Sequence, residues 1–157
     1  MVNVLFVCLG NICRSPTAEG VFKALVQREG LSDHITVDSA GVGDWHIGSP
    51  PDSRAQAAAR QRGIDLSKQR ARQAVAHDFE RFDYVIAMDS QNYGDLTRMC
   101  PKGGDDRLFK FLAFAPQLGI NDVPDPYYGG DSGFDGVFDM IEAASAGLLD
   151  DIRANHL

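Results

Sequence analysis

The chain has 157 residues, of which 44% are hydrophobic, and carries a formal net charge of −7 from 15 Lys and Arg against 22 Asp and Glu. This length and apolar content are typical of one globular domain, here residues 1–157, and exclude a disordered chain. The acidic charge disfavours nucleic acid and anionic membranes as partners, because both require a positive surface.

The chain opens with a short apolar run. Residues 4–9 are apolar, far fewer than the roughly 20 residues of a membrane span. Residues 1–3 lack the basic region and cleavage site of a signal peptide, so we expect a cytoplasmic location. The β-branched and aromatic residues of the run predict a buried strand at 3–7, which is too short for a helix.

A helix is expected after this strand. Ser15 and Pro16 are typical of a helix start, with Ser as the N-cap and Pro at the first helical position. Apolar residues then recur at helical spacing, and Gly30 is the expected stop.

Strands and helices alternate along the rest of the chain. The predicted strands lie at 35–38, 82–88 and 108–112, the predicted helices at 53–62, 90–99 and 134–152, and a loop rich in Gly and Pro at 41–51. This alternation favours a single-domain α/β fold with a four-stranded parallel sheet, right-handed crossovers and helices on both faces.

The loop after the first strand carries the clearest chemistry. It reads Cys8-Leu9-Gly10-Asn11-Ile12-Cys13-Arg14-Ser15 and lies between a strand and a helix N-terminus, where α/β folds bind ligands. Backbone N–H groups of such a loop and the helix start can surround a phosphate-like dianion, and Arg14 can grip two of its oxygens. Gly10 and Asn11 are the residue types that most readily adopt the positive φ of a tight cradle.

Cys8 lies at the start of this cradle. A thiol near a helix N-terminus and an Arg favours the thiolate, and Ser15 could donate a hydrogen bond to it. Such a thiolate is placed for in-line attack on phosphorus. A lone Cys beside an Arg is more often a buried structural thiol, but the surrounding Gly, Asn and Ser favour the nucleophile. The chain has neither Gly-x-Gly-x-x-Gly nor Gly-Lys-[Ser/Thr], which makes nucleotide binding a weak alternative.

Hydrolysis of a phosphate ester also needs a proton for the leaving oxygen. The segment 122–130 is the best candidate source, because Asp125 lies between two prolines and is followed by Tyr127 and Tyr128. The prolines fix the local chain direction, and the aromatic pair offers a wall for a substrate ring. Taken alone, the segment is more typical of a surface turn.

The other cysteines and the histidines show no pattern typical of a metal site. The three cysteines are too few for a disulfide framework, and Cys100 is most simply structural. His34, His46, His77 and His156 lack the spacing of zinc ligands and are expected at the surface or in packing. We therefore expect no metal and no cofactor.

Together, the loop 7–16 and the segment Asp125-Pro126-Tyr127-Tyr128 resemble a low-molecular-weight protein tyrosine phosphatase. The resemblance extends over nearly the whole chain, including 37–39, the Trp45 loop and 82–89. It implies a four-stranded parallel sheet flanked by helices with flavodoxin-like winding, no metal, and a phosphocysteine intermediate. The expected partners are a phosphotyrosine protein or a small aryl phosphate, with phosphate and oxyanions as inhibitors.

The resemblance also implies roles for individual residues. Cys8 is similar to the nucleophile, Arg14 to the phosphate-binding arginine, and Asp125 to the general acid that later acts as base. Ser15 is similar to the residue that stabilises the thiolate. The implied substrate-binding residues are Leu9, Gly10, Asn11, Ile12, Cys13, Trp45, Tyr127 and Tyr128, of which Ile12 and the three aromatic residues form a rim around the phenyl ring.

Two further roles follow from the same resemblance. Asn11 and Ser39 are similar to a hydrogen-bonded pair that holds the strained cradle, and Cys13 to a second thiol that forms a reversible disulfide with the nucleophile. Gln69 departs from the His that animal members often carry in the supporting network. The chain is expected to be a monomer that can self-associate weakly through its aromatic rim.

Three alternatives stay open. An arsenate reductase of the same fold uses a similar loop, but needs two more redox cysteines, and this chain has only Cys100 beyond Cys13. A protein-arginine phosphatase usually has Thr in place of Ile12. The third alternative is a non-catalytic phosphotyrosine- or anion-binding module, which an assay with p-nitrophenyl phosphate would distinguish. The segment 94–107 supports none of these assignments.

Overall fold

The structure is a computed structural model that describes residues 1–128 and 132–157, without the side chains of residues 128 and 132. Within this part of the chain, four parallel strands form one sheet in the order β2-β1-β3-β4. The strands are β1 (Val2–Cys8), β2 (Ile35–Gly41), β3 (Tyr84–Ala87) and β4 (Leu108–Lys110). The predicted fold class, a single-domain α/β fold with a four-stranded parallel sheet, is confirmed.

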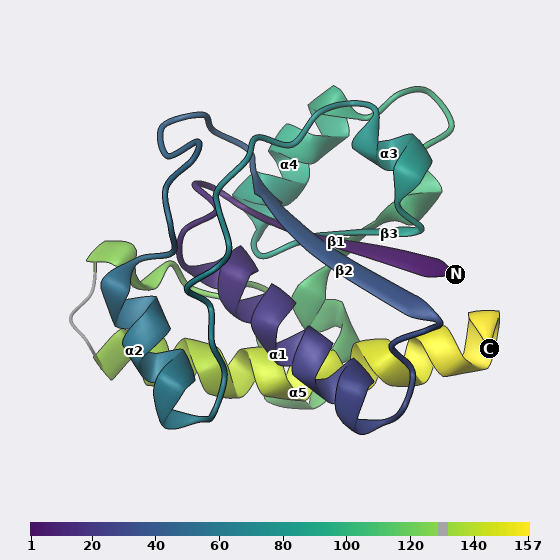
Figure 1. The fold of residues 1–157 in the computed structure, drawn as a ribbon. Coiled ribbons are helices and arrows are strands. Elements are labelled where there is room, and N and C mark those ends of the chain that lie inside the picture. The colour runs from purple at the N-terminus through teal and green to yellow at the C-terminus, as the bar shows by residue number, and fades with distance from the viewer. Residues whose placement is uncertain (129–131) are drawn as a thin grey trace.

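Helices cover both faces of the sheet (Figure 1). The helices α1 (Arg14–Arg28), α2 (Ser53–Gln61) and α5 (Ser132–His156) pack against one another below it, and α3 (Asp78–Arg81) and α4 (Ser90–Met99) lie above it. Short 3-10 helices complete the described elements: η1 (Asp105–Arg107), η2 (Phe111–Phe114), η3 (Pro116–Leu118) and η4 (Pro126–Tyr128).

The central strand β1 explains this layering. Val4 and Phe6 belong to a buried cluster with α1 and α5, whereas Leu5 and Val7 belong to a second cluster with residues of α3 and α4. Alternate side chains of a strand point to opposite faces, and all four are fully buried. A parallel strand covered on both faces therefore reads as a continuous apolar run, as β1 does.

The predicted start of the first helix is wrong. α1 begins at Arg14, and its N-cap is Cys13, which makes no capping hydrogen bond through its side chain. The hydroxyl of Ser15 is turned instead toward Cys8 and Ala40. Ser15 therefore does not cap the helix. Its hydroxyl contacts the active-site loop and the end of β2 instead.

Two other boundaries differ from the prediction. The predicted strand 108–112 ends at Lys110, and the chain then turns into η2, whose Phe111 and Leu112 are buried in the cluster shared with α5. The predicted strand 82–88 is longer than the observed β3, which comprises Tyr84–Ala87. Tertiary packing decides both ends, and the apolar run alone does not show where sheet pairing stops.

The parallel arrangement places the carboxyl ends of the strands at one edge of the sheet. Cys8 ends β1 and lies opposite Gly41, which ends β2. Val42 continues this contact by donating its N–H to the Cys8 carbonyl at 2.9 Å. The loop that follows Cys8 is therefore fixed between the ends of two strands and the start of α1.

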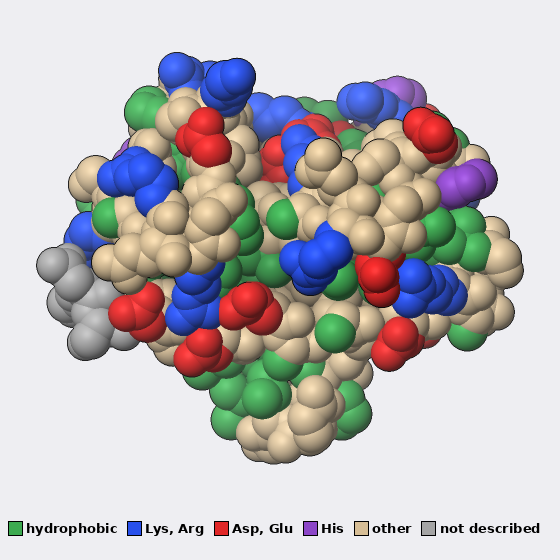
Figure 2. All heavy atoms as spheres, turned by 60° about the horizontal axis from the view of Figure 1, so that its bottom comes forward, with side chains coloured by type: hydrophobic (Ala, Val, Ile, Leu, Met, Phe, Trp, Pro, Cys, Tyr) green, Lys and Arg blue, Asp and Glu red, His purple; other side chains and the backbone are tan. Residues whose placement is uncertain are grey.

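The face formed by α1, α2 and α5 gives little support for a polyanion partner. Figure 2 brings the layer of α1, α2 and α5 toward the viewer and shows basic and acidic side chains interspersed on it. Of the helices that the structure describes, none is long and apolar enough to cross a membrane.

Candidate active site

The loop between β1 and α1 closes around the Cys8 sulfur. Cys8 is 3% exposed. Its Sγ lies 3.0 Å from Ser15 Oγ and accepts the N–H of Asn11 at 3.3 Å. When Cys8 is a thiolate, the Ser15 hydroxyl must be the donor, because the sulfur then carries no proton. Two donors thus converge on the sulfur.

Asn11 gives the loop its shape. It is the one non-glycine residue with a positive φ in the described part of the chain, at 58°. Its side-chain amide donates to Ser15 Oγ at 2.8 Å and to Ser39 Oγ at 3.0 Å. Its amide oxygen accepts the backbone N–H of Arg72 at 3.1 Å. Asn11 and Ser39 therefore form the predicted hydrogen-bonded pair, within a larger network.

Ser39 extends this network away from the loop. Its hydroxyl donates to Glu19 Oε1 at 2.7 Å, and Glu19 Oε2 accepts from Lys23. Gln69 is part of the same support, since its amide nitrogen donates to the Pro16 carbonyl at 3.0 Å. Its amide oxygen is buried without a partner in the described residues.

Glycines at two positions allow the close packing of the loop. A Cβ on Gly41 would lie 3.0 to 3.1 Å from backbone atoms of residues 9 to 11, so a side chain there would push the backbone of the loop outward. Gly10 is not among the glycines with positive φ, so the expectation that it would adopt this conformation is wrong. A Cβ on Gly10 would instead lie 2.9 Å from the His46 ring. A side chain at residue 10 would therefore displace the His46 ring, and of Gly10 and Asn11 only Asn11 takes the positive φ.

Arg14 is held from behind by acidic and carbonyl oxygens. Its Nη1 donates to Asp89 Oδ2 at 2.6 Å and to the Val123 carbonyl at 2.9 Å, and its Nη2 lies 3.6 Å from Asp125 Oδ2. Burial opposes the charge, but the negative charge of Cys8 and the bond to Asp89 raise the pKa of Arg14. Arg14 therefore stays a fixed cation in an otherwise buried position.

Asp125 lies at the mouth of the loop. Its side chain is 29% exposed, and its Oδ1 accepts the N–H of Tyr127 at 3.0 Å. This bond orients the carboxyl group while Oδ2 faces Arg14. The predicted nucleophile, arginine and acid thus come from β1, α1 and the segment before η4, and the fold brings them together.

A cavity of about 380 Å³ opens above these three residues. It is lined by Cys8, Leu9, Gly10, Ile12, Cys13, Arg14, Trp45, His46, Asp125 and Tyr127. Trp45 is 68% exposed and Tyr127 40% exposed, so aromatic rings stand at the mouth and the sulfur lies at the floor. The cavity can hold a flat aromatic group with a tetrahedral anion beneath it.

Three of the predicted site residues lie outside the lining of the cavity. Asn11, Ser15 and Ser39 are buried, and none is among the residues that line the cavity; they support the loop from behind. The side chain of Tyr128 lies outside the described part of the chain. His46, expected at the surface or in packing, lies at the rim with its ring 6.5 Å from the Tyr127 ring.

Sequence reasoning missed Asp89. Asp89 lies two residues after the end of β3, at the edge of the sheet where α/β folds place ligand-binding residues. This position was the available signal for a role of Asp89 in the site. Its two oxygens have separate tasks, since Oδ1 accepts the N–H of Asn92 as the cap of α4 and Oδ2 binds Arg14. The cap fixes the carboxylate, and the carboxylate fixes the arginine.

Cys13 is a buried free thiol at the wall of the cavity. Burial, the charge of Asp52 and the charge of Cys8 raise its pKa well above the ordinary thiol value. Cys13 is therefore protonated at neutral pH, unlike a nucleophile. Among residues 1–128 and 132–157, no group of three or more His, Cys, Asp or Glu side chains is placed to hold a metal ion.

Comparisons with known proteins agree with this geometry. Residues 3–157 match the family described as "Low molecular weight phosphotyrosine protein phosphatase". The chain is 43% identical to the low molecular weight protein-tyrosine-phosphatase YfkJ of Bacillus subtilis over 153 residues, which cover 98% of this chain and 97% of the relative. It is 44% identical to the human low molecular weight phosphotyrosine protein phosphatase over 150 residues, 94% of each chain. A crystal structure of a protein tyrosine phosphatase from Entamoeba histolytica, with Hepes in its active site, superposes with a TM-score of 0.96 at 40% identity over 100% of both chains.

Proposed function

Because the chain belongs to the low molecular weight phosphotyrosine protein phosphatase family, we propose that Cys8, Arg14 and Asp125 perform its chemistry. The protein is a protein tyrosine phosphatase, and the predicted reaction class is confirmed. The residue assignment rests on one observation above all. The Cys8 sulfur, the Arg14 guanidinium and the Asp125 carboxyl line one cavity that is rimmed by aromatic rings. We propose that residues 1–157 form one catalytic domain around it.

In the first step the Cys8 thiolate attacks phosphorus, and the bond from phosphorus to the tyrosyl oxygen breaks. Asp125 gives its proton to that oxygen, so that tyrosine leaves as the phenol. Arg14 and the N–H groups of the loop bind the three equatorial oxygens. Nη1 of Arg14 is committed to Asp89 and Val123, so phosphate is bound through the opposite edge of the guanidinium.

In the second step a water molecule hydrolyses the phosphocysteine. Asp125, now a carboxylate, takes a proton from the water as the water oxygen forms its bond to phosphorus. The bond from phosphorus to sulfur breaks, and inorganic phosphate and the Cys8 thiolate result. The partly exposed position of Asp125 supports this dual role, because water can reach it once the phenol has left.

Phosphate should be recoverable on Cys8. We expect rapid denaturation during turnover of p-nitrophenyl phosphate to leave a phosphorylated peptide that contains Cys8, detectable by mass spectrometry. The Cys8→Ser variant is the control and should give no phosphocysteine. Phosphate found on another residue, or an active wild-type enzyme that never forms a phosphorylated peptide, would contradict the assignment.

The substrate class follows from the shape of the cavity. The sulfur lies at the floor, and Trp45 and Tyr127 stand at the exposed mouth, so aromatic rings surround the path to the sulfur. This lining supports a phosphotyrosine protein or a small aryl phosphate as the substrate. Hepes in the active site of the Entamoeba protein supports phosphate and other oxyanions as inhibitors here.

Two wider assignments are also proposals. Three free thiols support a cytoplasmic location, because oxidising compartments favour disulfides. Trp45 and Tyr127 are exposed at the cavity mouth, and this supports a monomer that self-associates weakly through its aromatic rim.

Peroxide should inactivate the enzyme reversibly. The Cys8 thiolate attacks a peroxide oxygen to give a sulfenic acid, and the Cys13 sulfur then forms a disulfide with Cys8 as water leaves. The high pKa of Cys13 makes this closure slow at neutral pH and faster in alkali. We expect Cys13→Ser to regain less than about half of the activity that wild type regains with dithiothreitol. Cys100→Ser is the matched control. If Cys13→Ser regained as much activity as wild type, Cys13 would have no part in protecting Cys8 through a disulfide.

A further inference from the structure

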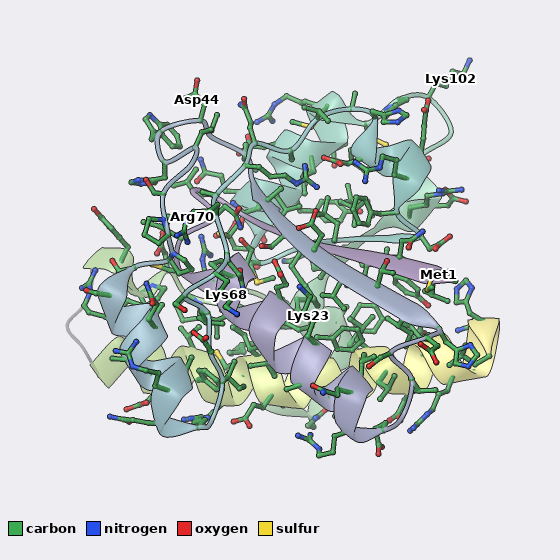
Figure 3. The ribbon with its side chains drawn as sticks, in the orientation of Figure 1. Met1, Lys23, Asp44, Lys68, Arg70 and Lys102 are labelled. Carbon is green, nitrogen blue, oxygen red and sulfur yellow. The ribbon has the colours of Figure 1, made fainter. Side chains whose placement is uncertain are left out.

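The segment between α2 and α3 runs beside the active-site loop (Figure 1). Lys68 and Arg70, labelled in Figure 3, mark its course past α1 toward the end of β2. There it pairs with the end of β2 through two hydrogen bonds of 2.8 Å, from Gly41 N–H to the Arg72 carbonyl and from Ala74 N–H to the Gly41 carbonyl. Residue 72 is therefore placed directly behind the loop that contains Asn11.

The Arg72 side chain is clamped between two carboxylates. Its Nε and Nη2 donate to Asp38 Oδ2 at 3.2 and 3.1 Å, and its Nη1 and Nη2 donate to Asp78 at 3.1 and 3.2 Å. Asp78 is only 1% exposed and also accepts the N–H of Val75 at 2.9 Å. A planar guanidinium with bonds on two edges has little freedom to rotate, so this clamp fixes the backbone of Arg72.

The fixed backbone serves Asn11. The Arg72 N–H donates to Asn11 Oδ1 at 3.1 Å, while Asn11 holds its positive φ and directs its own N–H to the Cys8 sulfur. A positive φ is unfavourable for a residue with a side chain and persists only where its surroundings over-determine it. The amide of Asn11 is bonded at both ends, and Arg72 supplies the bond at the oxygen end.

We propose that Arg72 is a positioning residue of the phosphatase reaction, which acts through Asn11 and holds the phosphate loop in its catalytic shape. This proposal rests on the proposed function of the Cys8 loop. The contact to Asn11 comes from the main chain, so a substitution at residue 72 keeps the donor itself. The substitution removes the side-chain clamp and leaves the main-chain pairing with Gly41, and the loop amides and the Cys8 sulfur then lose their common alignment.

The direct test is Arg72→Ala. We expect kcat/KM for p-nitrophenyl phosphate to fall about tenfold and the inhibition constant of inorganic phosphate to rise by a similar factor, because both report the same loop. Arg62→Ala is the matched control. Arg62 lies at the end of α2, and its half-buried side chain binds Asp139 and Glu142 of α5. It is not among the residues that line the cavity. Arg62→Ala should keep both constants within about twofold of wild type even where its melting temperature falls.

A double-mutant cycle decides whether Arg72 acts through Asn11. In an Asn11→Ala background, Arg72→Ala should lower kcat/KM by less than about twofold, since its target is already gone. An undiminished tenfold effect there would overturn the proposal. So would an Arg72→Ala enzyme within about twofold of wild type in both constants.

A milder variant keeps the test valid if Arg72→Ala does not fold, since that change leaves the buried carboxylate of Asp78 unpaired. Asp38→Asn weakens the exposed half of the clamp and retains an oxygen for the Ser39 N–H. We expect a smaller loss of kcat/KM that also disappears with Asn11→Ala, and an equal loss in both backgrounds would overturn the proposal. Failure of the proposed function is distinct, because Cys8→Ser would then stay active whatever residue 72 does.

Discussion

Replacing Cys8 by Ser should lower kcat for p-nitrophenyl phosphate by more than about 10⁴-fold, because a protonated hydroxyl is a far weaker nucleophile than a thiolate. The measurement is steady-state release of p-nitrophenol at saturating substrate. Loss of this size is expected only if the sulfur itself forms the bond to phosphorus. A residue that merely shaped the cavity would cost much less.

The anion site should survive this substitution. Arg14 is held by Asp89 and the Val123 carbonyl, and neither contact involves Cys8. Inorganic phosphate should therefore still bind to Cys8→Ser, which isothermal titration calorimetry can measure. This pair of results separates a nucleophile from a structural thiol, whose loss would weaken binding and turnover together.

Cys100→Ser provides the control for a thiol outside the cavity. Cys100 follows α4, and its Sγ donates to the Pro101 carbonyl. We expect its activity to stay within about twofold of wild type. A Cys8→Ser enzyme that retained about a tenth or more of wild-type activity would remove Cys8 from the mechanism.

The sequence predicted the fold well because its periodicities are strong. The apolar run of β1 and the helical spacing in α5 are each enough to identify the element, and the parallel order follows from their alternation. The errors lie at boundaries such as Ser15 and Lys110. At these boundaries, contacts with residues distant in the sequence decide where the element begins or ends. The periodicity of the sequence contains no information about such contacts.

The active site was predictable to the extent that it is local. Cys8, Asn11 and Arg14 lie within one loop, so their spacing alone indicates a phosphate cradle. Asp89 and Arg72 were missed, because they reach that loop across 75 and 61 residues of sequence. Only the position of Asp89 just after β3 signals a role at the site, and nothing near Arg72 marks it as a partner of the loop. The fold alone brings them there.

Asp125→Asn should slow the hydrolysis of phenyl phosphate about 10²- to 10⁴-fold, because phenolate leaves poorly without a proton. The loss should be much smaller for p-nitrophenyl phosphate, whose leaving group is stable as the anion. Asn keeps the size of the side chain and an oxygen for the Tyr127 N–H, so the segment should keep its shape. The measurement is kcat for both esters in both enzymes.

Asp122→Asn is the matched control in the same segment. Asp122 is exposed, and Lys110 and Ser90 hold its pKa below the ordinary value, but it does not line the cavity. Its removal should affect the two esters equally and by less than about twofold. If Asp125→Asn also slowed both esters equally, the effect would come from loss of the ion pair with Arg14. It would not come from loss of the proton that Asp125 gives to the leaving oxygen. Dependence on the leaving group is thus the property that identifies Asp125 as the acid.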